Sequence, residues 1–150
     1  MTVTSFWRDE KLLAPGSAVA TALDGLAAAT GCQLRERSEY DVVYSARSGP
    51  TLEGFRVEAV SFDCAAGDLE EAVASARQIS SRAQLLPGFN FTVVETAPGP
   101  RVISVTTWSD EHYAAAAMVE LAADYARHPW PTEADAIMRR PGRVIFSSSA

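Results

Sequence analysis

Residues 86–113, LPGFNFTVVETAPGPRVISVTTWSDEHY, hold the pattern that decides the fold. Two runs rich in β-branched and aromatic residues, Phe89–Thr96 and Arg101–Trp108, are separated by Pro98-Gly99-Pro100. Runs of this composition favour strands, and a short Pro/Gly connection between them favours an antiparallel hairpin. We therefore expect a β-hairpin over residues 89–108.

Apolar stripes with helical spacing lie on both sides of this hairpin. The first stripe follows Asp68, which is spaced from Glu71 as in an acidic variant of the capping box. Its members are Leu69, Ala72, Val73, Ala76, Ile79 and Ala83. The second stripe begins after Ser109 or Asp110 and ends at His128-Pro129, because the residue before a proline is pushed out of the α conformation. Its members are Tyr113, Ala117, Met118, Leu121 and Tyr125.

Further strands are expected before the first helix, at Phe55–Cys64, and after the second helix, at Val144–Ser147. The resulting order is strand, helix, strand, strand, helix, strand. This βαββαβ order is the split βαβ, or ferredoxin-like, arrangement of an α+β fold, in which helices cover one face of an antiparallel sheet. We assign it to a domain of residues 51–150.

The first 50 residues predict a separate βαββ extension. Its expected elements are the strands Val3–Trp7, Cys32–Ser38 and Tyr40–Arg47 and a helix over Ser17–Gly31. Helix, glycine, strand, turn and strand follow one another here as they do around the hairpin. The extension is therefore either a degenerate half-repeat of the main domain or an unrelated segment that packs on the same core.

The composition is that of an ordinary globular protein, with 150 residues, 47% of them hydrophobic. The net charge is −6, and Lys11 is the only lysine, so we expect no nucleic-acid partner, because phosphate binding requires a basic surface. No apolar run approaches the roughly 20 residues of a membrane span. Met1–Glu10 lacks the apolar core of a signal peptide. We therefore expect a cytoplasmic protein with no membrane partner.

The strand at Arg101–Trp108 presents two different faces. Ile103 and Val105 share one face. The other face carries Val102, Ser104, Thr106 and Trp108. An aromatic ring with two hydroxyls is typical of a ligand pocket, which is apolar with a few groups that orient a substrate. The alternative is a core tryptophan with hydroxyls bonded to nearby backbone.

Two further substrate-binding candidates lie outside that strand. Asn90 shares a strand face with Thr92 and Val94 and is a second polar group for the pocket. Trp130 follows His128 in an aromatic-rich corner, which is either a lid over the cavity mouth or a packed helix exit.

Acid–base candidates lie at the start of the second helix. The helix dipole disfavours the protonated form of His112, which suits a neutral general base, although an exposed first-turn histidine is the alternative. Tyr113 could donate a hydrogen bond to a developing oxyanion or simply pack in the core. We expect structural roles for Asp63 and Cys64. We expect both cysteines, Cys32 and Cys64, to be small buried hydrophobes.

The sequence gives no sign of a metal site. His112 and His128 have no carboxylate partner at ligand spacing, and neither HxxE nor CxxC occurs. A serine nucleophile is also not expected, since GxSxG is absent.

The region Phe55–Ala126 resembles the antibiotic biosynthesis monooxygenase family of dimeric α/β-barrel proteins. The ordered matching features are Pro87-Gly88-Phe89 before a strand, Pro98–Pro100 in the hairpin, and Trp108–Glu111 where the second strand gives way to a helix. The terminal RRPGRVIFSS is similar to the last strand of longer polyketide-pathway members. The resemblance implies a homodimer in which two sheets meet as a barrel, with a cavity between each sheet and its helices. A half-repeat at residues 1–50 could instead cover part of that surface.

Some members of this family oxidise anthrone-type polyketide intermediates with O₂ and without metal, flavin or haem. The family often uses an asparagine four residues before the strand-ending tryptophan, together with aromatic residues on the next helix. Trp108 matches this pattern, but Ser104 stands in place of the asparagine and Tyr113 lies one residue early. Haem-degrading relatives carry a histidine that binds the iron near the position of Met118. Because this chain has methionine there and His112 lies at the start of the helix instead, the resemblance argues against a haem cofactor.

The sequence therefore predicts a monooxygenase-like enzyme without cofactor that acts on a hydrophobic, aromatic polyketide-type small molecule in bacterial specialised metabolism. Its expected catalytic residues are Trp108, His112 and Tyr113. Its expected substrate-binding residues are Asn90, Ser104, Thr106 and Trp130. Two alternatives stay open, a polyketide cyclase or dehydratase on the same fold and a ligand-binding or assembly module without catalysis.

Overall fold

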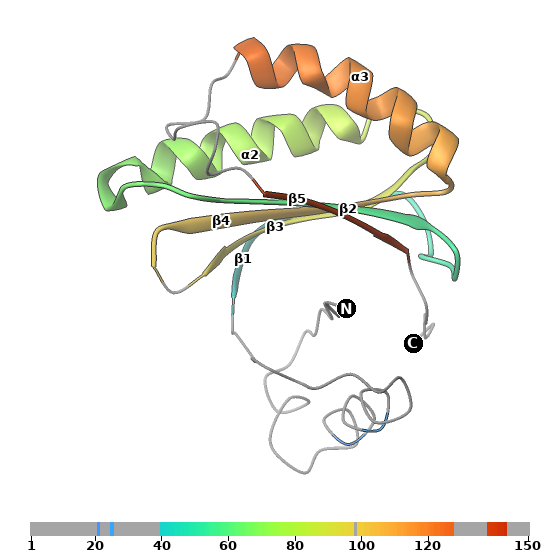
Figure 1. Cartoon of the computed structure of the whole chain (residues 1–150), viewed down its shortest axis with the longest axis horizontal. Helices are drawn as coiled ribbons and strands as arrows, with labels where there is room; N and C mark the ends of the chain where they lie inside the picture. Colours follow the sequence, from blue (N-terminus) through green and yellow to red (C-terminus); the bar gives the residue numbers. More distant parts are fainter. Residues whose placement is uncertain (1–20, 22–24, 26–39, 98, 128–137, 144–150) are drawn as a thin grey trace. The chain divides into compact units, whose positions relative to one another are not determined.

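The computed structural model of the chain describes residues 21, 25, 40–97, 99–127 and 138–143 (Figure 1). The chain divides into two units, residues 1–38 and residues 39–150. The described elements of the second unit are β1 (Asp41–Arg47), β2 (Arg56–Asp63), the 3₁₀ helix η2 (Ala66–Asp68), α2 (Leu69–Ala83), β3 (Phe89–Ala97), β4 (Arg101–Trp108), α3 (Glu111–Arg127) and β5 (Met138–Arg143).

The strands form one antiparallel sheet in the order β1-β3-β4-β2-β5. Figure 1 shows α2 and α3 on the same face of this sheet. From β2 to β5 the chain follows the predicted βαββαβ order, so the ferredoxin-like α+β fold is confirmed. The predicted hairpin is confirmed as well, with β3 and β4 paired from Phe89 and Trp108 to Ala97 and Arg101.

The last described strand lies before the predicted one. β5 has the sequence MRRPGR and pairs with β2, whereas the predicted strand Val144–Ser147 lies outside the described residues. Proline and glycine are disfavoured in strands, which is why the pattern did not indicate β5. Pro141 is tolerated because β5 stands at the end of the described sheet order, where a missing N–H breaks no central ladder.

The predicted cap of the first helix is wrong, although the helix itself is confirmed. Asp68 precedes α2 but makes no side-chain capping hydrogen bond. The reason is the 3₁₀ helix η2, which holds Asp68 at φ −101° and ψ 0° and bonds its N–H to the carbonyl of Ala65. A capping residue needs an extended backbone to turn its side chain back toward the helix, and η2 removes that conformation.

The N-terminal predictions fall mostly outside the described residues. This holds for Val3–Trp7 and Cys32–Ser38, while Thr21 and Gly25 of the predicted helix are helical. β1 corresponds to the predicted strand Tyr40–Arg47, and its described partner is β3. Among the described residues, the sheet therefore begins at Asp41.

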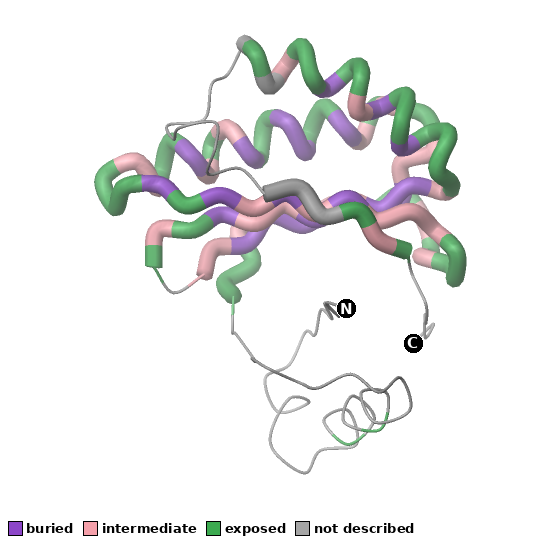
Figure 2. The backbone as a smooth tube through the Cα atoms, in the orientation of Figure 1, coloured by how far each residue is buried: buried purple, intermediate pink, exposed green. Residues whose placement is uncertain are grey.

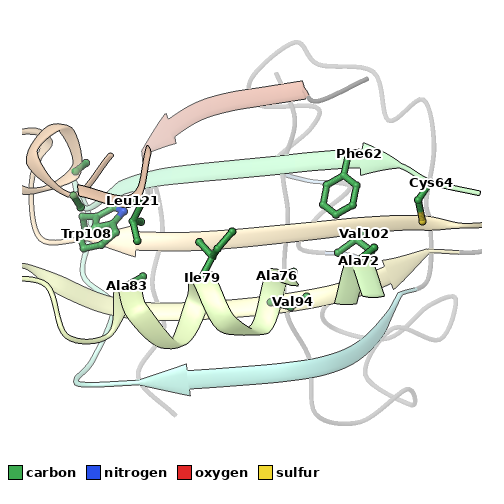
Figure 3. Packing of buried hydrophobic residues seen from close by; sticks show 12 residues of the cluster. Phe62, Cys64, Ala72, Ala76, Ile79, Ala83, Val94, Val102, Trp108 and Leu121 are labelled. Carbon is green, nitrogen blue, oxygen red and sulfur yellow. The ribbon is translucent and has the colours of Figure 1, made fainter. Parts of the chain in front are cut away.

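A hydrophobic core fills the space between the sheet and the two helices (Figures 2 and 3). Its buried members are Phe62, Cys64, Ala72, Ala76, Ile79, Ala83, Val94, Val102, Trp108, Ala114, Ala117 and Leu121. The helices contribute mainly alanines, which lets their backbones approach the sheet closely. The larger side chains come from the strands and from Ile79 and Leu121.

The opposite face of the sheet, which we call the far face, carries the alternate strand residues. Paired positions place Phe91 beside Thr107, Val93 beside Val105 and Glu95 beside Ile103 on this face.

None of the helices in the described ranges is long and apolar enough to cross a membrane.

Candidate functional site

A layer of polar side chains lies inside the core, on the sheet face that the helices cover. Thr106 of β4 is paired with Thr92 on one side and with Glu58 on the other. The Thr92 and Thr106 hydroxyl oxygens are 3.0 Å apart. Ser80 of α2 reaches down to this layer, with its hydroxyl 3.4 Å from those of Ser104 and Thr92. The structure therefore places Ser104 and Thr106 on the same inner face as Trp108, as strand periodicity predicted.

A small cavity opens against this polar layer, between the sheet and the two helices. Its volume is about 20 Å³. Its wall consists of Glu58, Val60, Ile79, Ser80, Ala83, Ser104, Thr106, Trp108, Met118 and Leu121. A single water molecule needs about 10–15 Å³, whereas small-molecule sites begin at roughly 300 Å³. In this conformation the cavity therefore accommodates a water-sized molecule.

Trp108 is the anchor of the cavity wall. It is 1% exposed, and its ring packs edge-on against Phe89 with centroids 6.0 Å apart. Figure 3 shows it beside Leu121, which belongs to α3. Its indole Nε1 is the one buried side-chain nitrogen or oxygen without a hydrogen-bond partner in the described part of the chain. An unsatisfied buried donor costs about 1–3 kcal/mol, so this N–H is available to an acceptor that enters the cavity.

Glu58 supplies a buried carboxylate to the same wall. It is 4% exposed, and its Oε1 accepts a hydrogen bond from Arg56 Nε at 3.2 Å. Glu58 is not among the site residues predicted from the sequence. The signal was nevertheless present, because Glu58 alternates with Val60 and Phe62 and must share their inward face. A carboxylate, three hydroxyl side chains and the indole of Trp108 thus line one interior space.

Asn90 lies away from this cavity. A register shift at Phe89/Phe91 displaces it from the inner face. Its Nδ2 donates to the carbonyls of Gly49 at 3.1 Å and Pro50 at 2.9 Å. Its Oδ1 accepts from the hydroxyls of Thr51 at 2.7 Å and Thr107 at 3.1 Å. The geometry thus shows Asn90 fastening the 48–51 loop to the hairpin, and its predicted substrate contact stays a prediction.

His112 and Tyr113 occupy the exposed first turn of α3. Tyr113 is 38% exposed, and its backbone N–H donates to Asp110 Oδ1 at 2.9 Å, which caps the helix. The His112 and Tyr113 rings lie edge to face with centroids 5.8 Å apart. Neither side chain belongs to the wall of the cavity around Trp108. Their predicted acid–base roles also stay predictions.

The Tyr113 ring explains the glycine in the Pro87-Gly88-Phe89 turn. Gly88 has φ +76°, and a Cβ at this position would lie 2.4 Å from Tyr113 Cγ. Only glycine tolerates both this backbone conformation and this close contact. The motif therefore serves the junction between β3 and α3.

The remaining sequence candidates have structural surroundings. Cys64 is buried and its Sγ donates to the carbonyl of Pro100 at 3.2 Å, and burial raises the pKa of its thiol. Asp63 bonds to Arg101, which lowers the pKa of the Asp63 carboxyl. Trp130 and Cys32 lie outside the described residues. Among the residues that the structure places, no group of three histidine, cysteine or acidic side chains could hold a metal ion.

A second hollow lies on the surface between the two helices. This groove has a volume of about 270 Å³. It is lined by Gln78, Ile79, Ser81, Arg82, Leu85 and Asp124. Arg82 Nε and Asp124 Oδ2 are 3.7 Å apart across it.

No family model and no curated protein matches this sequence, but solved structures share its fold. A ferredoxin-fold protein from Listeria monocytogenes related to antibiotic biosynthesis monooxygenases is 16% identical, with 76% of this chain and 69% of that chain covered and a TM-score of 0.53. An anthrone oxidase-like protein is 17% identical, with 74% and 56% covered and a TM-score of 0.54. A major regulator of staphylococcal pathogenesis is 12% identical, with 76% and 72% covered and a TM-score of 0.58.

These similarities establish the architecture. The chain has the ferredoxin-like fold of proteins related to antibiotic biosynthesis monooxygenases, as the sequence resemblance implied. It spans little more than half the length of the anthrone oxidase-like protein. Because the same fold serves both oxidase-like proteins and a regulator, the chemistry has to be argued from the site.

Proposed function

We propose that this chain is a monooxygenase-like enzyme that needs no cofactor and oxidises an aromatic, polyketide-type small molecule at the polar layer beneath α3. The observation that carries the proposal is the unpartnered Trp108 indole N–H, which is buried beside Glu58 and the Ser104 and Thr106 hydroxyls. Polar groups in a core are nearly always satisfied, because an orphaned donor is destabilising. A substrate oxygen would supply the missing acceptor.

The proposed chemistry assigns each polar group a task. Glu58 accepts the proton of a phenol or of its ketone tautomer, and Arg56 holds the Glu58 carboxylate in place. Trp108 Nε1 donates to the resulting oxyanion, which is stabilised most in a site without bulk water. The electron-rich anion reacts with O₂. For an anthrone, the CH₂ group becomes C=O, and the second oxygen atom leaves as water.

A substrate cannot enter without a conformational change, since the closed cavity has about 20 Å³. The element best suited to move is α3, whose buried side chains, among those that the structure describes, are Ala114, Ala117 and Leu121. Displacing α3 would therefore break few large contacts.

The test uses anthrone as probe, with O₂ uptake and anthraquinone formation measured together. We expect one O₂ consumed per anthraquinone formed, above the uncatalysed rate and without added metal or flavin. Glu58→Gln should lower kcat by about 10²–10⁴-fold. Glu95→Gln is the matched control, because Glu95 is also a buried glutamate but lies on the far face. Equal losses in both variants, or no uptake with anthrone and related phenols, would overturn the proposal. Turnover under nitrogen would point to the cyclase alternative.

A binding module without catalysis is the second candidate, and the cavity size favours it. A closed space of about 20 Å³ suits a small polar ligand or a structural water better than a ring system. One protein of this fold is described as a regulator. This candidate predicts that a ligand raises the melting temperature by an amount that follows RT ln(1 + [L]/Kd), without product.

We also propose that two copies associate through their sheets, which is the arrangement that the family resemblance implies. The apolar side chains of Phe91 and Ile103 on the far face support this, because both are partly exposed in the single chain. Val93 and Val105 between them are already buried, at 2% and 4% exposed. Sedimentation equilibrium should give twice the mass of the chain. A monomer at all concentrations would instead favour the alternative in which the N-terminal segment covers that surface.

A further inference from the structure

One side chain belongs to the walls of both the buried cavity and the surface groove. Ile79 of α2 lines both hollows. It is 5% exposed, and it points from α2 toward the sheet in Figure 3. A change at Ile79 therefore alters the wall of both hollows.

The two helices place inner and outer residues on either side of this point. On α2, Ser80 and Ala83 line the inner cavity while Arg82 lines the outer groove. On α3, Leu121 lines the cavity and Asp124, three residues later, lines the groove. Residues three apart share one helix face, so both hollows lie along the same contact between α2 and α3.

We propose that the groove between α2 and α3 is the entrance to the polar cavity, with Ile79 as the gate that sets the width of the molecules admitted. This inference rests on the proposed function, because it gives the cavity its substrate. With the gate open, the volumes of about 20 and 270 Å³ merge into a space close to the roughly 300 Å³ at which small-molecule sites begin. The joined space, unlike the closed cavity, accommodates an aromatic ring.

The ion pair across the groove is the latch of this entrance. Arg82 is 53% exposed and Asp124 is 20% exposed, so solvent screens their attraction. Exposed pairs of this kind shift an equilibrium by no more than about fivefold. The latch thus biases the gate toward the closed state and still allows it to open.

The experiment measures access to Trp108 directly. The parent protein for this experiment carries Trp7→Phe and Trp130→Phe, so that Trp108 is its only tryptophan. Quenching of the Trp108 fluorescence by acrylamide then reports how easily a small molecule reaches the indole ring. Quenching should be weak in this parent. Ile79→Val should raise the quenching constant and Ile79→Ala should raise it further. Arg82→Gln and Asp124→Asn should each raise it by up to about fivefold, and the double variant should add little, since either change already opens the latch.

Two control variants separate a local opening from a general loosening. Val102→Ala removes methyl groups from the same core, but Val102 lines neither hollow. Arg101→Gln breaks the Arg101–Asp63 ion pair on the sheet, away from the helices. Both should leave quenching at the parent level. Ile79→Val keeps the test valid if Ile79→Ala does not fold.

The inference is overturned if Ile79→Val and the latch variants leave quenching unchanged, or if the controls raise it as much. This outcome is independent of the proposed reaction, because no substrate is present. If no O₂ is taken up but the Ile79 and latch variants raise quenching, the proposed reaction is rejected and the proposed entrance is retained. O₂ uptake with quenching that Ile79 does not control would reject the entrance alone.

Discussion

At the scale of single residues, the burial of Glu95 on the far face makes the stability of the protein depend on pH. Desolvation raises the pKa of its carboxyl to about 7, from 4.5. The folded chain therefore keeps a proton that the unfolded chain releases, and the free energy of unfolding falls as the pH rises from about 4.5 to about 7. The decrease is at most about 3 kcal/mol. Above this range the free energy levels off.

Urea unfolding between pH 4.5 and 8 checks this expectation. Glu95→Gln should flatten the profile and should be more stable than the parent protein at pH 8. The Asp63 carboxyl, whose pKa lies below 3.8, titrates outside this window and does not interfere. A profile that keeps its slope in Glu95→Gln would assign the pH dependence to another group.

Gly88 and Tyr113 form a second test at the residue scale. Gly88→Ala should destabilise the protein by about 2–4 kcal/mol, because alanine is strained at φ +76° and its Cβ overlaps the Tyr113 ring. In a Tyr113→Gly background, which also removes the Tyr113 Cβ that would lie 2.4 Å from the added methyl group, the same change should cost only the backbone part, about 1–2 kcal/mol. Thermal unfolding of all four proteins gives the coupling energy. Additive losses would mean that the ring moves aside freely.

At the scale of elements, the hairpin and the loop before β2 depend on Asn90. Asn90→Ala removes four hydrogen bonds and should destabilise the chain by about 2–4 kcal/mol, with faster amide exchange in residues 48–51. Thr107→Val removes one of the four and should lose about 1 kcal/mol. If Asn90→Ala instead lowers activity and keeps stability, the substrate contact predicted from the sequence is correct.

The elements also show how far sequence reasoning reached. β3, β4, α2 and α3 follow from their periodicity, because burial on one side imposes a fixed spacing of apolar residues. The shared inner face of Ser104, Thr106 and Trp108 follows from the same rule. β5 could not be predicted in this way, since MRRPGR has no strand pattern and owes its conformation to pairing with β2. Likewise, the missing Asp68 cap depends on η2, a turn that no local signal indicates.

At the scale of the whole molecule, the site combines residues from four elements. Glu58 comes from β2, Ser80 from α2, Trp108 from β4 and Met118 from α3. Their distance from one another in the sequence is why Glu58 and Ser80 were missed. Sequence patterns give the face of each strand or helix, but the meeting of several faces depends on the register of the sheet and the placement of the helices over it.

The stability and ligand binding of the whole molecule together test whether Trp108 contacts a ligand. Trp108→Phe should cost no more than about 2 kcal/mol of stability, because the lost packing is partly offset by removing an unsatisfied indole N–H. Binding of a phenolic probe should weaken at the same time. Chemical denaturation and calorimetric titration measure the two effects. A loss of stability with binding untouched would make Trp108 a core residue only.

The two outer strands of the described sheet bear on how the molecule avoids aggregation. β1 is interrupted by an irregularity between Val42 and Tyr44, and β5 contains Pro141, which offers no N–H. Bulges and prolines at a sheet margin prevent another chain from adding as an extra strand. At both margins of the described sheet, the addition of another chain as an extra strand is thus disfavoured.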